Sequence, residues 1–170
     1  MVIAVYGLPG SGKSYFAERL SKKISAEYVN SDRLRKAMFP KRTYSRREKE
    51  AVYTAMLEKM QMAIKEKRNI VMDATFHQDQ RRKALLKKLN GRDNIYFIEM
   101  KADEAVIRQR LKKERIDSDA DFSVYNLLLR EWEPMKEEHL LLHSTDNNIE
   151  QLLTDALKYL RKKDDKTSNR

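Results

Sequence analysis

The chain has 170 residues, the size of one domain, and is long enough to bury a core without disulfides or metals. It contains no cysteine, which excludes disulfide bonds and thiolate metal sites, and its 36 Lys and Arg against 26 Asp and Glu give a net charge of +10. This excess attracts polyanions such as nucleic acids, phosphorylated metabolites or acidic lipids, although a solvated lysine-rich surface explains it equally well.

The first predicted element is the apolar run VIAVY at 2–6, which we interpret as a buried strand. This run is too short for the core of a signal peptide, and no basic region precedes it. No other apolar stretch approaches the roughly 20 residues that cross a bilayer. We therefore expect a cytoplasmic protein that makes no use of a membrane, and nothing in the sequence indicates its oligomeric state.

A glycine-rich loop, GLPGSGKS at 7–14, follows this strand. Its glycines allow successive backbone N–H groups to turn inward, and the helix predicted at 13–24 adds the positive end of its dipole. Such a loop binds nucleotide phosphates, with Lys13 reaching the β- and γ-phosphates and Ser14 holding Mg²⁺. The residues predicted to contact ATP are Gly7, Leu8, Pro9, Gly10, Ser11, Gly12, Lys13, Ser14 and Tyr15.

A weaker second strand is predicted at 27–30, and Asp32 follows it in the segment NSDRLRK. In a doubly wound sheet the carboxyl ends of adjacent strands open into one crevice, so Asp32 is expected to face the phosphate-binding loop. Its carboxylate can accept the proton of an acceptor hydroxyl, and Arg35, one helical turn on, can hold an anionic group of the acceptor. The alternative is that Asp32 only caps a short helix with solvated arginines.

The segment at 33–47 carries only basic charged residues and is interrupted by Pro40, so we expect it to resist packing. A long helix then begins after Ser45, which has capping-box spacing to Glu48. Apolar side chains recur along this helix at helical spacing as far as residue 64. The basic segment therefore lies between the predicted base and a regular, packed helix.

The third strand, NIVMDAT at 69–75, is expected to end beside the first. Asp73 is placed to reach Mg²⁺ through a water, or to orient Arg35 or the acceptor, and Thr75 can form a hydrogen bond there. The alternative is a buried aspartate bonded to loop amides. Asp73 is followed by Ala74, where hydrolytic ATPases often place a glutamate, and the N-K-x-D motif of GTPases is absent. Both observations favour phosphoryl transfer to a hydroxyl over hydrolysis.

Helices and strands continue to alternate along the rest of the chain. We predict a helix at 78–90 closed by Gly91, a strand at 94–100, helices at 103–115 and 120–132, a strand at 139–143 and a helix from 149. This alternation favours parallel pairing, so the fold class is α/β, a five-stranded parallel sheet with helices on both faces. We expect a single domain over 1–163 and a basic, frayed tail at 164–170.

The segment at 108–121 is basic first and acidic after, and it lies between two predicted helices. Such a segment can close over a nucleotide as a small helical lid, with an arginine reaching the transferring phosphoryl group. Arg110 and Arg115 are the first candidates and Arg108 the next, although the three do not share one helical face. The alternative for each is an exposed, charged helix end.

Three arginine- or aromatic-containing features give weaker signals. Arg81 and Arg82 open the helix after Asp73 and are expected at the surface, with contact to an acceptor as the alternative. Trp132 is expected in the core on an apolar stripe, with stacking on a nucleobase as the alternative. The loop STDNNIE at 144–150 is placed to frame the base of the nucleotide, although nothing in it is specific for adenine.

In chain order, GLPGSGKS, NSDRLRK, IVMDATF, RQRLKKERIDSDADFSVY and EWEP resemble the small-kinase branch of the P-loop proteins over 1–135. That branch includes the kinase domain of bacteriophage-type polynucleotide 5′-kinases and is related to zeta-toxin and gluconate-type kinases. The resemblance implies the three-layer P-loop NTPase sandwich with strand order 2-3-1-4-5. It covers the kinase step alone, without the phosphatase and ligase domains that often accompany polynucleotide kinases.

The same resemblance implies roles for single residues. Asp32 matches the general base, and Arg35 matches the arginine that contacts a phosphate of the acceptor nucleotide. Asp73 matches the acid at the end of the third strand. An arginine within 108–115 matches the lid arginine, but the family pattern has two arginines four residues apart, and Arg110 and Arg115 are five apart.

The function that these observations favour is an ATP- and Mg²⁺-dependent kinase that phosphorylates a hydroxyl, with a polynucleotide 5′-OH as the first acceptor. The alternative acceptor is a small metabolite, such as a sugar, nucleoside or nucleotide-sugar. A third hypothesis is a nucleotide-sensing module that binds nucleic acid without significant turnover.

Overall fold

A computed structural model describes residues 1–89, 95–113 and 120–168, with the side chains of the last helix described as far as residue 162. Five strands form one parallel sheet in the order β2-β3-β1-β4-β5, which confirms the predicted class and strand order. The strands are β1 (Val2–Tyr6), β2 (Glu27–Asn30), β3 (Ile70–Ala74), β4 (Ile95–Lys101) and β5 (His139–His143).

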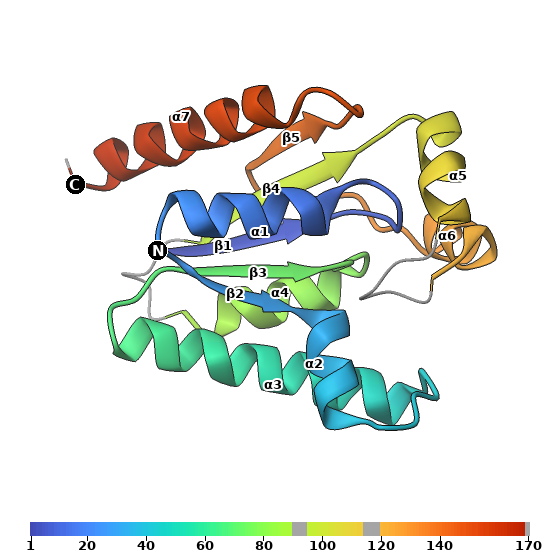
Figure 1. The fold of residues 1–170 in the computed structure, drawn as a ribbon. Helices are drawn as coiled ribbons and strands as arrows, with labels where there is room; N and C mark the ends of the chain where they lie inside the picture. Colours follow the sequence, from blue (N-terminus) through green and yellow to red (C-terminus); the bar gives the residue numbers. More distant parts are fainter. Residues whose placement is uncertain (90–94, 114–119, 169–170) are drawn as a thin grey trace.

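Helices cover both faces of the sheet, as predicted. The described helices are α1 (Lys13–Lys23), α2 (Ser31–Met38), α3 (Arg46–Lys65), α4 (Asp79–Lys87), α5 (Glu104–Lys112), α6 (Phe122–Arg130) and α7 (Ile149–Ser168). Figure 1 shows α1 and α7 on one face and α3 and α4 on the other, with α2, α5 and α6 beyond the carboxyl ends of the strands. Among the described residues, no helix has the length and apolar character needed to span a bilayer.

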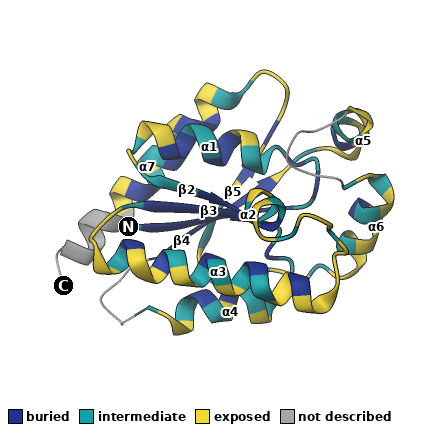
Figure 2. Ribbon diagram, turned by 60° about the horizontal axis from the view of Figure 1, so that its bottom comes forward, coloured by how far each residue is buried: buried dark blue, intermediate teal, exposed yellow. Residues whose placement is uncertain are grey.

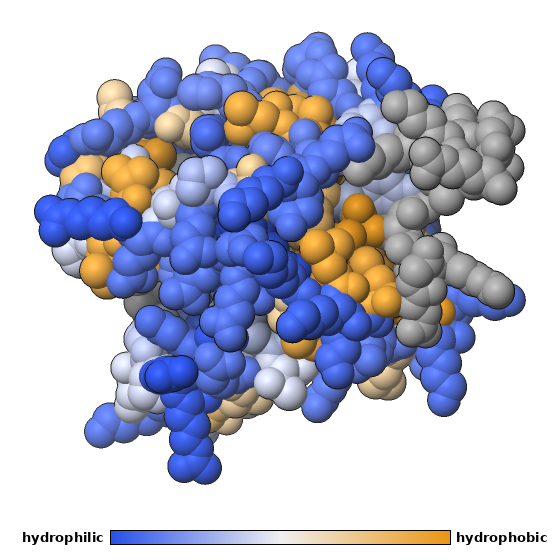
Figure 3. Space-filling view, turned by 180° about the vertical axis from the view of Figure 1, so that it is seen from behind, coloured by the Kyte–Doolittle hydropathy of each residue, from blue (hydrophilic) through white to orange (hydrophobic). Residues whose placement is uncertain are grey.

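Each face of the sheet has its own core because successive side chains of a strand point to opposite faces. Ile3 and Val5 of β1 pack toward α1 and α7, whereas Ala4 and Tyr6 pack toward α3 and α4. Figure 2 shows the strands buried between helices whose outer faces are exposed. Viewed from behind, the surface is largely hydrophilic and is interrupted by separate apolar patches (Figure 3). The strand ends are therefore held by packing on both sides.

The register brings polar side chains together at the carboxyl edge of the sheet. Asn30, the last residue of β2, pairs with Asp73 of β3, and Asp73 pairs in turn with Val5 of β1. Two residues after Val5, the chain leaves β1 at Gly7 and enters the glycine-rich loop. This edge therefore places the loop, Asn30 and Asp73 beside one another.

Two segments differ from the prediction. Residues 31–38 form α2 and bury the side chain of Arg35, so the prediction that 33–47 resists packing is wrong for its first half. Asn30 explains the difference, because its side chain accepts hydrogen bonds at the start of α2. At the other end of the chain, α7 continues to Ser168 and carries helix into the segment 164–170 that was expected to fray. Gly91, expected to close α4, lies outside the described residues.

Arg82 of α4 is fully buried, although its position predicted a surface residue. Its Nη1 donates to the carbonyl oxygens of Phe76 (2.8 Å) and His77 (3.1 Å), in the loop after β3. Its Nη2 donates to the carbonyl oxygens of Glu133 (2.9 Å) and Pro134 (3.1 Å), in the segment that follows α6. One side chain thus joins two loops that are distant in sequence.

We expect Arg82→Met to lower the free energy of unfolding by about 3–5 kcal/mol, because four carbonyl groups lose the donor that a fully buried guanidinium supplies. Lys22→Met is the matched control, since Lys22 is exposed and its pair with Glu18 joins neighbouring turns of α1. Its effect should stay within about 0.5 kcal/mol. Urea denaturation of the three proteins measures both values, and equal midpoints would show that the four contacts contribute nothing.

Candidate active site

The loop between β1 and α1 requires glycine at its first position. Gly7 has a φ of 154°, and a Cβ added there would lie 2.4 Å from the carbonyl oxygen of Met100 in β4. Any side chain would therefore meet both backbone strain and a rigid neighbour. At the other end of the loop, Gly12 is the N-cap of α1 and no side chain caps this helix. The first-turn N–H groups of α1 are consequently available to an anion.

A cavity of about 570 Å³ opens beside this loop, within the size range of ligand pockets. It is lined by four residues predicted to carry the chemistry, which are Lys13, Ser14, Asp32 and Arg110. These residues come from α1, α2 and α5, which meet at the carboxyl end of the sheet (Figure 1). The structure thus brings the phosphate-binding residues, the predicted base and one lid arginine to a single space.

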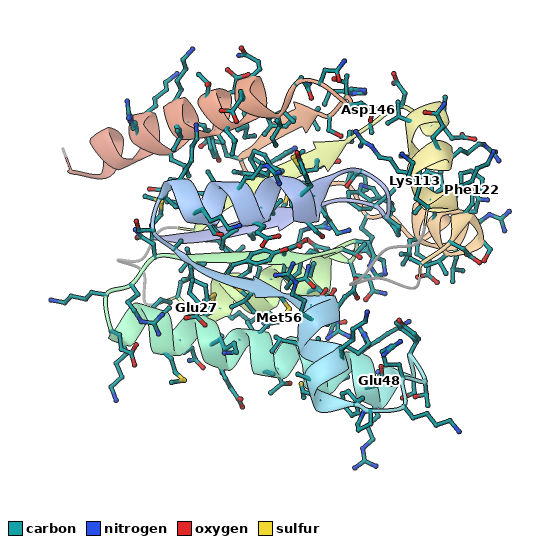
Figure 4. All side chains as sticks on the ribbon, viewed as in Figure 1. Glu27, Glu48, Met56, Lys113, Phe122 and Asp146 are labelled. Carbon is teal, nitrogen blue, oxygen red and sulfur yellow. The ribbon has the colours of Figure 1, made fainter. Side chains whose placement is uncertain are left out.

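The loop that follows β5 forms another wall of the cavity, through Ser144, Thr145, Asp146 and Asn148. Asn148 closes this loop, because its Oδ1 accepts from the N–H of Thr145 and its Nδ2 donates to the carbonyl oxygen of His143, both at 2.9 Å. The sequence indicated the place of the loop but not its contacts with the rest of the site. Figure 4 shows Asp146 and Lys113 at the end of the molecule where α5 lies.

Arg110 holds the walls of the cavity together. Its Nη1 donates to Ser144 Oγ at 2.8 Å and to the carbonyl oxygen of Gly10 at 3.2 Å. Its Nη2 donates to Asp146 Oδ1 at 3.1 Å, and Ser144 Oγ donates in turn to the carbonyl oxygen of Ser11 at 2.7 Å. In this structure the guanidinium therefore fixes the phosphate-binding loop to the loop after β5. Its predicted contact with the moving phosphoryl group stays a prediction.

Asp73 lies fully buried at the end of β3 and is bonded by side chains, not by the loop amides of the alternative prediction. Its Oδ2 accepts from the hydroxyl of Tyr28 at 2.7 Å and from Nδ2 of Asn30. Burial, followed by the charge of Asp73, raises the pKa of Tyr28, which keeps this hydroxyl protonated as a donor. Asp73 Oδ1 is buried and has no hydrogen-bond partner among the described residues.

Asp32 stands in the first turn of α2, but it is not the cap of that helix. Asn30 is the N-cap, because its Oδ1 accepts from the backbone N–H groups of Asp32 and Arg33, each at 2.9 Å. The alternative in which Asp32 only caps a helix is therefore wrong. Its carboxylate contributes to the cavity that also contains Lys13 and Ser14.

Arg35 is buried and forms an ion pair with the equally buried Glu48 of α3 at 3.2 Å. Glu48 also accepts from the N–H of Thr43 at 2.8 Å and from the N–H of Tyr44 at 3.1 Å. Burial opposes ionisation, but these hydrogen bonds outweigh it and lower the pKa of Glu48. The predicted contact of Arg35 with an acceptor stays a prediction, since its Nε has no hydrogen-bond partner among the described residues. Figure 4 shows Glu48 beside α2.

Of the remaining predicted residues, those that the structure describes lie apart from the cavity. Arg115 lies outside the described residues, and Arg108 is exposed and pairs with Glu104 on its own helix at 2.8 Å. Thr75 is half-buried after β3 and does not line the cavity. Trp132 stacks on Tyr6, with ring centroids 6.0 Å apart, which confirms its predicted place in the core.

A sequence model of the family described as "AAA domain" matches residues 2–135, most of the chain and all of the strands except β5. The chain belongs to this family. A search of curated proteins returns no match. For this AAA domain, the family match spans the phosphate-binding loop, Asp32 and Arg110, whereas the loop after β5 lies beyond it.

Several solved structures with the same fold are described as kinases. A sugar kinase from Janibacter sp. HTCC2649 is 17% identical with a TM-score of 0.74 and 94% of each chain covered. The Mycobacterium tuberculosis APS kinase CysC, solved with AMPPNP and APS, is 16% identical with a TM-score of 0.70, covering 94% of this chain and 96% of that one. A chain of the Pnkp1/Rnl/Hen1 RNA repair complex is 21% identical with a TM-score of 0.64, covering 76% of this chain and 43% of that one. At these identities the likeness shows a P-loop kinase-like fold.

We expect Arg110→Met to weaken nucleotide binding about tenfold or more, because the phosphate-binding loop and the loop after β5 lose their common donor. Lys112→Met is the matched control on the same helix, since Lys112 is an exposed cation that does not line the cavity. Its affinity should stay within about twofold of the unchanged protein. Calorimetric titration with a non-hydrolysable ATP analogue measures the three constants. Equal losses in both variants would contradict this role for Arg110.

We expect Glu48→Gln to reduce stability at pH 7, because Arg35 keeps its charge in a buried place without a carboxylate. The pKa of Glu48 is lowered from its ordinary value of 4.5, so its stabilisation is present above pH 4.5 and is lost as the pH falls through the folded pKa. Denaturant unfolding across this range should show that the difference in free energy of unfolding between the two proteins becomes smaller in acid. Glu150→Gln, which breaks an exposed pair with Lys23, should show no comparable difference. A difference in free energy of unfolding that does not change with pH would contradict the stabilising role of the ionised Glu48.

Proposed function

We propose that this AAA domain is an ATP-dependent kinase that transfers the γ-phosphoryl group to an acceptor hydroxyl. The observation that carries the proposal is the presence of Asp32 in the same cavity as Lys13 and Ser14. A carboxylate beside a phosphate-binding loop is placed to accept the proton that the hydroxyl releases on attack. The APS kinase solved with AMPPNP and APS, which shares the fold, supports a nucleotide as the donor.

The residues at the end of β3 fit a magnesium ion. Asp73 Oδ1 is a buried carboxylate oxygen that no described residue bonds, and Asn30 Nδ2, which donates to the other oxygen of Asp73, lies 3.4 Å from Ser14 Oγ. Hydroxyl and carboxylate oxygens are hard ligands of the kind that Mg²⁺ selects, with phosphates and waters completing its shell. We propose that Ser14 holds the ion and that Asp73 binds one of its waters. When bound, Mg²⁺ neutralises charge on the β- and γ-phosphates.

The other residues of the cavity position the reactants. In the proposed mechanism Lys13 and the first-turn amides of α1 bind the phosphates, and Arg110 keeps the loop after β5 against the phosphate-binding loop. Asp32 accepts the hydroxyl proton as the acceptor oxygen bonds to phosphorus and ADP leaves. The lid arginine that would stabilise the moving phosphoryl group is Arg110 or Arg115.

The first acceptor that we propose is the 5′-OH of a nucleic acid. Exposed basic side chains of the segment that follows Asp32 support it, namely Arg33, Lys41, Arg46 and Arg47. A basic surface beside the catalytic carboxylate suits a chain of phosphates. The likeness in fold to a chain of an RNA repair complex points in the same direction.

A small phosphorylated or sugar-like metabolite is the second candidate acceptor. The buried pair of Arg35 with Glu48 favours an acceptor without a phosphate, such as a sugar, because one end of the Arg35 guanidinium is bonded to the protein. The likeness to a sugar kinase and an APS kinase supports it too. A nucleotide-sensing module that binds nucleic acid without turnover is the remaining alternative.

The proposal is tested with γ-labelled ATP, Mg²⁺ and either 5′-OH oligonucleotides or a pool of metabolites. We expect a labelled acceptor, and Asp32→Asn should slow its formation about 10²–10⁴-fold while ATP affinity changes little. Asp155→Asn is the control, since Asp155 is on α7 and its carboxylate contacts Gln151 at the surface. If a metabolite becomes labelled and the oligonucleotides do not, the acceptor is a small metabolite and not a nucleic-acid 5′-OH. ATP binding without label on any acceptor would favour the binding module.

A further inference from the structure

One side chain, Asn30, connects the two halves of the candidate site. Asn30 is the last residue of β2 and also the N-cap of α2, so it stands where the sheet ends and the helix that carries Asp32 begins. Its side chain is only 5% exposed and lies opposite the fully buried Asp73 in the β2–β3 register. An amide in such a place must satisfy both its oxygen and its nitrogen within the protein.

The orientation of this amide follows from its partners. Two backbone N–H groups, those of Asp32 and Arg33, lie 2.9 Å from one end of the amide, and only an oxygen can accept from both. The other end is therefore the NH₂ group. It donates to Oδ2 of Asp73 and lies 3.4 Å from Ser14 Oγ. The amide thus bonds the base-bearing helix on one side and the proposed metal-binding residues on the other.

We propose that Asn30 is a positioning residue that sets Asp32 relative to Ser14 and Asp73. Because α2 has only eight residues, its orientation depends on contacts with the rest of the fold and not on its own stability. The contacts described for it include the cap from Asn30 and the pair of Arg35 with Glu48, together with the pair of Arg33 with Glu18 and the packing of Leu34 on the core. Among these, the cap bonds the backbone N–H of Asp32 itself, so a shift at Asn30 acts directly on the residue that carries the base. This inference rests on the proposed kinase activity.

Asn30 acts through Asp32 more than through the metal-binding residues. Tyr28 donates to the same oxygen of Asp73 at 2.7 Å, so the carboxylate stays held when the amide is lost. The backbone N–H of Asp32 bonds Asn30 Oδ1, and the NH₂ group of the same amide ties this cap to Asp73, so without the amide Asp32 is no longer set against Asp73. Loss of the amide should therefore lower the rate of transfer and leave nucleotide binding nearly unchanged. A displacement of about 1 Å at a catalytic group is enough to cost roughly 100-fold in rate.

The informative substitution is Asn30→Ser. Serine is a good N-cap, so α2 keeps an acceptor for its first amides, but the hydroxyl cannot also reach Asp73 as the amide does. Tyr28→Phe is the comparison, because it removes a hydrogen bond to the same oxygen of Asp73 and a 3.3 Å bond from Asn30 Nδ2, while both bonds that Asn30 Oδ1 accepts from α2 stay in place. Circular dichroism melting of both variants shows that each remains folded.

The test is a double-mutant cycle with Asp32→Asn, measured by single-turnover transfer of label from ATP. We expect Asn30→Ser to lower kcat about tenfold or more, with KM for ATP within about threefold. Because Asn30 acts through Asp32, the double variant should be no slower than Asp32→Asn alone. Tyr28→Phe, in contrast, should slow the reaction by the same factor in the presence and absence of Asp32.

The outcomes separate this inference from the proposed function. If the unchanged protein transfers label and the effects of Asn30→Ser and Asp32→Asn multiply, the kinase stands and the positioning role is wrong. If Asn30→Ser raises KM and leaves kcat unchanged, the residue serves nucleotide binding and the inference also fails. If the residual rate of Asp32→Asn is below detection, the separate effects of Asn30→Ser on kcat and on KM decide between a positioning role and a role in nucleotide binding. If the unchanged protein transfers no label to any acceptor, the proposed function falls and the inference with it.

Discussion

Parallel hydrogen bonding among β1, β3 and β2 is the constraint on which the candidate site depends. It aligns Val5, Asp73 and Asn30 across three strands, so the phosphate-binding loop and the helix that carries Asp32 leave the sheet side by side. Burial on both faces prevents a strand from sliding, because a shift of one residue would turn its apolar side chains toward the wrong core. The relative positions of the phosphate-binding loop and Asp32 therefore depend on the packing of helices against both faces of the sheet.

The sequence was sufficient for the parts of the site that local chemistry specifies. Residues 7–14 specify their loop through glycines and a following helix, and the order of strands follows from alternation and from the resemblance to P-loop kinases. Asp32 lines the same cavity as Lys13 and Ser14, a position that follows from the way the carboxyl ends of neighbouring strands open together. These inferences need only short segments and the handedness of the crossovers.

Contacts between segments that are distant in the sequence could not be predicted from it. Nothing near Arg35 indicates that Glu48 is its partner, and nothing near Arg82 indicates that two loops supply four carbonyl groups to it. Basic residues in a charged segment are usually solvated, so pattern alone favours exposure for both. The sequence indicated the place of the loop at 144–150, but the contacts of Ser144 and Asp146 were missed for the same reason, since their hydrogen bonds to the phosphate-binding loop and to Arg110 join distant parts of the chain.

The bonds from Arg82 to Glu133 and Pro134 also connect the small helical region to the phosphate-binding loop. They attach the chain just after α6 to the loop beyond β3, and His77 of that loop lies 3.5 Å from the carboxylate of Glu131. Trp132 lies between these attachments and stacks on Tyr6, which immediately precedes Gly7. The end of α6 is therefore one stacked pair of rings away from the start of the phosphate-binding loop, so a displacement of α6 would act on that loop through Trp132 and Tyr6.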